Sequence, residues 1–140
     1  MAVLLAVPHY HTIRCKGVVL GKRASVLVDG GATHNFIDAE MVEKRKIPIE
    51  PLDGFIVVIP SHNTMQCKTW VPKLQVTVGN YNFVDSFYVV DVSSTNVVFG
   101  VKWLYYLGEH TVNYHIPEMK FQDSKGALRV VRGKHTYPVK

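Results

Sequence analysis

Apolar and polar residues alternate along much of this chain, which is the pattern of strands with one buried face. In the stretch HTIRCKGVVL, for example, Ile13, Cys15, Gly17 and Val19 alternate with more polar neighbours. The segments with strand character are residues 11–20, 23–28, 54–60, 65–70, 73–78, 81–92, 110–115, 119–122 and 127–131, with a turn at Gly21-Lys22. We therefore expect a mainly β fold, whose strands form a closed or nearly closed sheet that hides its edges.

Two short helices are expected between the strands. Asp38 is a favourable N-cap for a helix over residues 37–47, which Pro48 and Pro51 terminate. The segment VKWLYYLG, residues 101–108, predicts a second helix closed by Gly108. Its aromatic residues Trp103, Tyr105 and Tyr106 recur at helical spacing, and we expect them in the core and at an interface.

Composition excludes several classes of protein. A chain of 140 residues with 47% hydrophobic and 19% charged residues suits one folded domain. No apolar run approaches the roughly 20 residues that cross a membrane, and the opening MAVLLAV lacks the basic region of a signal peptide. The net charge of +5 indicates a basic surface, and we do not expect a nucleic-acid partner because no basic stripe is interleaved with aromatic residues.

Cysteine and histidine spacing does not predict a metal site. Cys15 and Cys67 are far apart and fit no zinc pattern, so we expect free thiols in a reducing, cytoplasmic compartment. His9 and His11 could share a strand face, but spacing places no third ligand beside them. We expect neither a metal nor an organic cofactor.

The stretch VLVDGGATHNFID places one carboxylate, Asp29, directly after a buried apolar run and follows it with Gly30 and Gly31. Two glycines permit unusual backbone angles and leave room for a ligand or another chain. An isolated ionised carboxylate in apolar surroundings is costly, so Asp29 must be protonated, paired, or face a group that shares its proton. The alternative is an aspartate that caps an ordinary turn.

Three segments together resemble one family. LVDGGATHNFI, residues 27–37, resembles the active-site loop of retropepsin-like aspartic proteases, and in detail that of gypsy-type LTR retrotransposons of plants. NVVFGVKWLYYLG, residues 96–108, resembles the family's second landmark, and TVNYHIPEMKF, residues 111–121, the strand pair that follows it. The resemblance divides the chain into an N-terminal extension (1–9), a protease domain (10–131) and a basic C-terminal tail (132–140).

The resemblance implies a closed retropepsin-like β-barrel that acts as a homodimer, with one aspartate contributed by each chain. Asp29 would be the catalytic residue, cutting a peptide or a retroelement polyprotein, in the cytoplasm or within retroelement particles. The predicted site residues are, in the active-site loop, Gly30, Gly31, Ala32 and Thr33; in a substrate-covering flap, Ile59, Pro60, Ser61, His62, Asn63 and Thr64; and in the second landmark, Val97, Val98, Phe99 and Gly100. We expect the apolar segments 26–28, 56–59 and 97–99 to line the cleft.

Other loop residues are expected to be structural. Thr33 and Asn35 suit hydrogen bonds to loop backbone, and His34 is expected to be exposed or hydrogen-bonded rather than a general base. Asp85 and Asp91 are expected at turns or at the rim.

Gly30 departs from the family pattern, which has Ser or Thr after the aspartate to hydrogen-bond across the twofold axis. Two missing bonds and two flexible loops together weaken a dimer by about 2–5 kcal/mol. A loss in that range raises the dissociation constant of the dimer by about 30- to 3,000-fold. One alternative that Gly30 leaves open is a retropepsin-like domain without activity that serves as a dimerisation or peptide-binding module. The basic net charge leaves open a second, a nucleic-acid-binding barrel.

Overall fold

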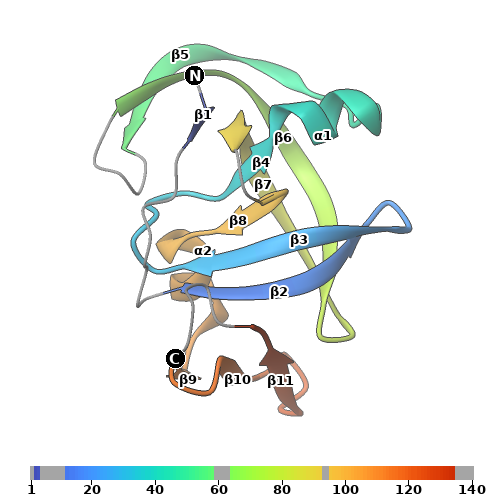
Figure 1. The fold of residues 1–140 in the computed structure, drawn as a ribbon, viewed down its shortest axis with the longest axis vertical. Coiled ribbons are helices and arrows are strands. Elements are labelled where there is room, and N and C mark those ends of the chain that lie inside the picture. The colour runs from blue at the N-terminus through green and yellow to red at the C-terminus, as the bar shows by residue number, and fades with distance from the viewer. Residues whose placement is uncertain (1, 4–11, 59–63, 93–94, 135–140) are drawn as a thin grey trace.

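The structure is a computed structural model that describes residues 2–3, 12–58, 64–92 and 95–134 (Figure 1). Strands dominate the described chain, and the two helices are short. The elements are β1 (Ala2–Val3), β2 (Thr12–Val19), β3 (Lys22–Asp29), β4 (Phe36–Asp38), α1 (Ala39–Lys44), β5 (Glu50–Val58), β6 (Thr64–Val78), β7 (Tyr81–Val92), β8 (Val97–Phe99), α2 (Val101–Leu107), β9 (His110–Asn113), β10 (Glu118–Gln122) and β11 (Leu128–Arg132). The expected mainly β fold is confirmed.

Strand pairing in the larger sheet closes on itself. The sheet runs in the order β1-β7-β4-β8-β3-β2-β6-β5, and β6 also pairs with β7. The pairings β7–β4–β8–β3–β2–β6–β7 therefore form a complete circuit, as the expected closed sheet requires. The strand β8 is central to this arrangement because it lies between β3, to which it is parallel, and β4, to which it is antiparallel.

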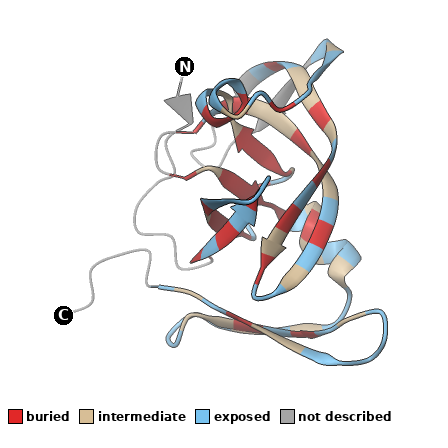
Figure 2. Ribbon diagram, turned by 90° about the vertical axis from the view of Figure 1, so that its right-hand side faces the viewer, coloured by how far each residue is buried: buried red, intermediate tan, exposed pale blue. Residues whose placement is uncertain are grey.

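A separate three-stranded antiparallel sheet, β11-β10-β9, lies below the larger sheet in Figure 1. Its inward residues Met119, Phe121 and Val131 are at most 2% exposed and belong to the same core cluster as the larger sheet. Figure 2 shows buried residues on both parts of the fold. The two sheets therefore share one core.

Aromatic rings join the two sheets and α2. The Phe99 and Trp103 rings stack with centroids 4.5 Å apart, and Phe83 contacts Trp103 at 5.0 Å and Phe121 at 5.7 Å. The expected core position is confirmed for Trp103, whereas Tyr105 and Tyr106 are 78% and 74% exposed and lie outside the core of the single chain. That they lie at an interface stays a prediction. In a helix this short, one face is enough to fill the core, and the two tyrosines lie on the other.

Several element boundaries differ from the sequence-based expectation. The two strands expected at 65–70 and 73–78 are one continuous strand, β6. Pro72 cannot donate a ladder hydrogen bond, and the pairing of β6 with β7 shifts register between Val71 and Leu74, so the strand passes the proline without ending there. Likewise β5 begins before Pro51, with a register shift between Pro51 and Phe55.

The β2–β3 turn and the first helix are also corrected in detail. The turn is formed by Leu20 and Gly21, with φ angles of 51° and 77°, rather than by Gly21-Lys22. Two positive φ angles match the right-handed twist of the strands that the turn joins. The helix α1 covers only Ala39–Lys44, because Lys46 adopts a φ of 53° before Pro48 is reached.

The predicted helix caps are confirmed. The Asp38 Oδ2 accepts a hydrogen bond from the Met41 amide at 3.4 Å, and Asp38 Oδ1 accepts one from the Val92 amide at 3.0 Å. Gly108 closes α2 with a φ of 84°.

Both cysteines are buried free thiols, and burial raises the pKa of Cys15 to about 12. Within the described chain, neither helix has the length and hydropathy of a membrane span.

Truncation of Phe121 to alanine tests whether the small sheet shares the core. Phe121 is 2% exposed and contacts Tyr81 and Phe83, so Phe121→Ala should lower the free energy of unfolding by about 3–5 kcal/mol. The matched control Leu128→Ala, at a side chain 64% exposed on the same sheet, should change it by less than about 0.5 kcal/mol. Urea denaturation followed by tryptophan fluorescence measures both. A loss below about 1 kcal/mol for Phe121→Ala would show that the small sheet is not part of the shared core.

Candidate active site

Asp29 lies at the carboxyl end of β3 and is 0% exposed. Its Oδ1 accepts a hydrogen bond from the Gly31 amide at 2.8 Å, and its backbone oxygen accepts one from the Ala32 amide at 3.1 Å. Residues 26–28, which precede Asp29 on β3, are also buried, in agreement with the apolar run in the sequence. A carboxylate is therefore held in the protein interior by the backbone of its own loop.

The two glycines after Asp29 are exposed to solvent, unlike the acid itself. Gly30 and Gly31 are exposed, whereas Asp29 and Ala32 on either side of them are buried. A Cβ at Gly31 would lie 3.2 Å from Asp29 Oδ1, so glycine leaves room for the carboxylate to fold back on the loop. The tip of the loop thus presents backbone to the outside while the acid lies directly behind it.

The second landmark, residues 97–100, packs against the Asp29 loop. In the parallel pair β3–β8, Val28 is opposite Phe99, which brings the following Gly100 beside the Asp29 loop. A Cβ at Gly100 would lie 2.6 Å from the Ala32 carbonyl oxygen, and the Val101 amide donates to that oxygen at 2.7 Å. Only glycine permits so close an approach of the two segments.

The landmark strand does not line a cleft. Val97, Val98 and Phe99 are at most 1% exposed, and residues 26–28 are at most 4% exposed. The expectation that these segments present apolar side chains to a substrate is therefore wrong for the single chain. Period-two alternation is absent from both segments because both of their faces are covered.

Asn35 ties the loop to β7 and β8. Its Oδ1 accepts a hydrogen bond from the Gly100 amide at 3.0 Å, its Nδ2 donates to the Ser86 carbonyl at 3.3 Å, and its own carbonyl accepts from the Tyr88 amide at 3.0 Å. The structural role expected for Asn35 is confirmed, and its partners are far away in sequence. Sequence reasoning could identify the residue but not the strands that it joins.

His34 lies beside an aromatic pair at the edge of the loop. Its ring is 5.2 Å from that of Tyr88, which stacks on Trp70 at 6.2 Å, and its Nδ1 is 2.8 Å from the Thr33 hydroxyl. Partial burial lowers the pKa of His34, and the positive charge of Lys102 lowers it further. His34 is thus hydrogen-bonded, as expected, and its neutral form is favoured.

Tyr114, in the turn between β9 and β10, was not singled out from the sequence. Burial raises the pKa of Tyr114, and the negative charge of Asp29 raises it further. The structure therefore places a tyrosine of the small sheet within the electrostatic reach of the acid. No local pattern could have identified it, because the two residues meet only through the docking of the small sheet.

The strands that flank the predicted flap form a hairpin. Phe55 pairs with Cys67 and Val58 with Thr64, as expected for residues 55–70. The predicted flap residues Ile59, Pro60, Ser61, His62 and Asn63 lie outside the described residues, and Thr64 is the first residue of β6.

Asp85 and Asp91 lie within β7, where the Asp85 Oδ1 accepts from the Ser86 amide at 2.8 Å and Asp91 is exposed.

No part of the chain that the structure describes brings together three histidine, cysteine, aspartate or glutamate side chains as a metal site would. His9 and His11 lie outside the described residues.

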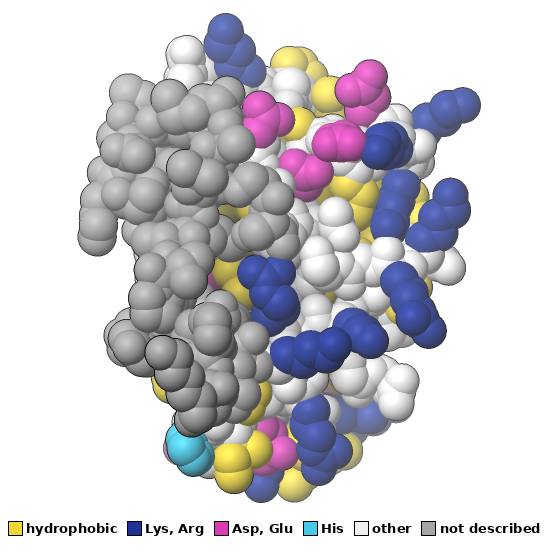
Figure 3. All heavy atoms as spheres, viewed as in Figure 1, with side chains coloured by type: hydrophobic (Ala, Val, Ile, Leu, Met, Phe, Trp, Pro, Cys, Tyr) yellow, Lys and Arg dark blue, Asp and Glu magenta, His cyan; other side chains and the backbone are white. Residues whose placement is uncertain are grey.

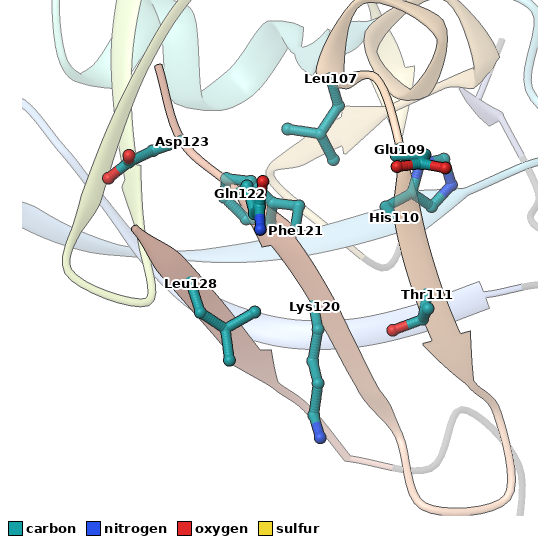
Figure 4. Close-up of a pocket in the computed structure, with 9 residues that line it drawn as sticks. All are labelled: Leu107, Glu109, His110, Thr111, Lys120, Phe121, Gln122, Asp123 and Leu128. Carbon is teal, nitrogen blue, oxygen red and sulfur yellow. The ribbon is translucent and has the colours of Figure 1, made fainter. Parts of the chain in front are cut away.

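An open depression of about 620 Å³ lies between the end of α2 and the small sheet (Figure 4). Two of its polar groups are engaged within the fold, since the His110 Nδ1 is 2.7 Å from the Gly108 carbonyl and the Asp123 carboxylate is 2.8 Å from the Arg129 Nε. The lining residues are Leu107, Glu109, His110, Thr111, Lys120, Phe121, Gln122, Asp123 and Leu128. None of the predicted site residues is among them.

Comparison with known proteins bears on the whole fold. The family described as retroviral aspartyl protease matches residues 9–123. The retroviral protease-like domain of Ddi1 from Leishmania major has a TM-score of 0.62 at 11% identity, covering 89% of this chain and 96% of that domain. At such identity the likeness shows the fold alone.

A second solved structure, the protein Lpg0085 of unknown function from Legionella pneumophila, has 11% identity over 69% of this chain and 86% of that one. Its TM-score of 0.43 is too low to bear on the fold. No curated protein sequence matches this chain. The family match spans most of the sequence, and the retropepsin-like fold agrees with it: the chain belongs to the retroviral aspartyl protease family.

Proposed function

We propose that the protein is an aspartic endopeptidase whose active site forms between two copies of the chain, with Asp29 as the catalytic residue of each. The observation that carries the proposal is the carboxylate of Asp29, which is 0% exposed at the end of β3 behind an exposed Gly30-Gly31 tip. A carboxyl group buried in this way, directly behind an exposed loop tip, is the kind of group that general acid–base catalysis uses.

A second copy completes the site. Each chain carries one Asp-Gly-Gly-Ala loop, and its exposed glycine backbone permits two such tips to meet at a twofold axis. Two carboxylates about 3 Å apart do not both ionise readily, so the pair holds one shared proton. That proton belongs to the pair rather than to either residue.

The shared proton determines the chemistry. The ionised carboxylate takes a proton from a bound water, whose oxygen attacks the carbonyl carbon of the scissile peptide bond. The protonated carboxyl donates a hydrogen bond to the carbonyl oxygen, where negative charge develops. Proton transfer to the amide nitrogen then lets the carbon–nitrogen bond break, which releases an acid and an amine. The residues of the chain supply both acid and base for this hydrolysis.

The β5–β6 hairpin is proposed to cover the substrate. It forms an antiparallel pair up to Val58 and Thr64, and it belongs to the same sheet as the strands that carry the Asp29 loop. A hairpin of this kind binds an extended peptide through backbone hydrogen bonds and excludes water from the reacting bond.

The substrate is proposed to be the polyprotein of an LTR retroelement, cut in the cytoplasm or within retroelement particles. Support comes from residues 27–37, whose sequence is similar to the active-site loop of gypsy-type plant elements. The buried free thiols of Cys15 and Cys67 suit a reducing compartment.

A second candidate function is an inactive retropepsin-like module that dimerises or binds peptides. Gly30 supports it, since glycine cannot make the hydroxyl hydrogen bond that normally braces the paired loops. The Ddi1 domain, which has a similar fold, is likewise described as protease-like. Peptide cleavage at acidic to neutral pH, blocked by a pepstatin-type inhibitor, distinguishes the enzyme from the module.

Replacement of the proposed catalytic acid should abolish cleavage. Asp29→Asn keeps the shape of the side chain but removes its capacity to act as a base, so we expect activity on a peptide substrate to fall at least about 10³-fold. Circular dichroism and urea denaturation should show a folded protein. Undiminished cleavage by the purified, folded variant would rule out Asp29 as the catalytic residue.

Restoration of a hydroxyl beside the acid should strengthen the dimer. Gly30→Ser supplies a donor at the exposed loop tip, and we expect the dissociation constant of the dimer to fall by about 30- to 3,000-fold. Activity at low protein concentration should rise accordingly. Sedimentation velocity across a range of concentrations measures this constant. The control Ala127→Ser adds a hydroxyl at an exposed turn of the small sheet and should leave it unchanged. Equal constants for Gly30→Ser and wild type would contradict the proposed contact between loop tips.

A further inference from the structure

A basic groove lies where the small sheet meets β2, and its lining includes no residue of the Asp29 loop. The groove has a volume of about 640 Å³. It is lined by Arg14, Cys15, Lys16, Ser25, Gly79, Asn80, Val130, Arg132, Gly133 and Lys134. Figure 3 shows lysine and arginine side chains gathered across the face that carries β2, β3 and the small sheet. Four of the lining residues are cations, and they come from two segments far apart in the sequence.

Two glycines bring these segments together. A Cβ at Gly133 would lie 2.6 Å from a methyl carbon of Ile13, and the neighbouring Lys134 amide donates to the Arg14 carbonyl at 2.7 Å. A Cβ at Gly79 would lie 3.0 Å from the Val130 carbonyl oxygen. The small sheet therefore docks closely on β2, and this docking places Arg132 and Lys134 beside Arg14 and Lys16.

Among the described residues, the lining of the groove holds four cations and no acidic side chain. Glu118 is 3.2 Å from Arg132, in an ion pair whose arginine side chain is 77% exposed, and it also contacts Lys120 at 3.5 Å. Lys16 and Lys134 are exposed, and Arg14 is half-buried. An open groove with this excess of positive charge attracts a polyanion.

The remaining lining favours phosphate over an acidic protein. Protein interfaces are usually built around buried aromatic or other large apolar anchors, whereas this groove offers Ser25, Asn80 and glycine backbone between its cations. Among the described residues, the lining contains no aromatic ring on which a base could stack. Recognition would therefore be directed to the sugar-phosphate backbone and would be independent of sequence.

We propose that this basic groove binds the phosphate backbone of a nucleic acid. The sequence alone favours a solvated basic surface and does not indicate this groove, because Arg14 and Lys16 are separated from Arg132 and Lys134 by most of the chain. The groove is built on the β2 face and not on the loop that carries Asp29, so this binding does not depend on the proposed proteolysis.

The test uses the full chain and a fluorescein-labelled single-stranded RNA of about 20 nucleotides, with fluorescence anisotropy measured across a salt series. Each phosphate contact with single-stranded nucleic acid contributes about 0.7 to the slope of log affinity against log salt. The double variant Lys16→Gln/Lys134→Gln should therefore lower the magnitude of that slope by about 1.4 and weaken binding about 25-fold at 0.1 M salt. Duplex DNA of equal length, in a parallel arm, identifies which nucleic acid is preferred.

The matched control is Lys68→Gln/Lys73→Gln, which removes the same charge from exposed positions on β6 that do not line the groove. It should weaken binding less than about 3-fold, and Asp29→Asn should bind as wild type does. Equal losses in the two lysine pairs, no salt-dependent binding by wild type, or tighter binding of a poly-glutamate peptide than of either nucleic acid would each overturn the proposal. Unchanged unfolding midpoints in urea keep all variants comparable.

Discussion

A single carboxylate buried at the end of a strand is the constraint on which the candidate active site depends. Burial of an ionised group is costly unless the fold supplies hydrogen bonds or a partner for its charge. Here the loop of Asp29 supplies its own amide at Gly31, and the start of α2, directly after β8, contacts that loop through Gly100 and Val101. The circuit of strands fixes β8 between β3 and β4, so the topology of the whole sheet determines where the acid lies.

The same close backbone contacts recur at the junction with the small sheet. Gly100 lets β8 approach the Asp29 loop, and Gly133 lets the small sheet approach β2. Each contact brings distant segments within reach of one another: the first assembles the loop network around Asn35, and the second gathers the cations of the basic groove. The glycines thus allow the close backbone contacts that form the Asp29 loop region and the basic groove, while the shared aromatic core holds the two sheets against each other.

Local sequence patterns predicted those features that depend on local physics. The alternation in β2, the Asp38 cap and the Gly108 closure of α2 all rest on neighbouring residues, and the structure confirms them. Features that depend on tertiary partners were missed. Pro72 did not end β6 because its position coincides with a register shift, and the apolar segments around β3 and β8 are core because other strands cover both of their faces. Tyr114 and the basic groove arise only when the small sheet docks.

The central claim is that one active site takes an Asp29 from each of two chains. Mixing tests it most directly: wild type is combined with an equal amount of Asp29→Asn, at constant total concentration well above the dimer constant, and peptide cleavage is measured. Random pairing leaves both acids in about a quarter of the dimers, so activity should fall to about a quarter of that of pure wild type. Activity that stays at about one half, as for chains that each act alone, would contradict the account.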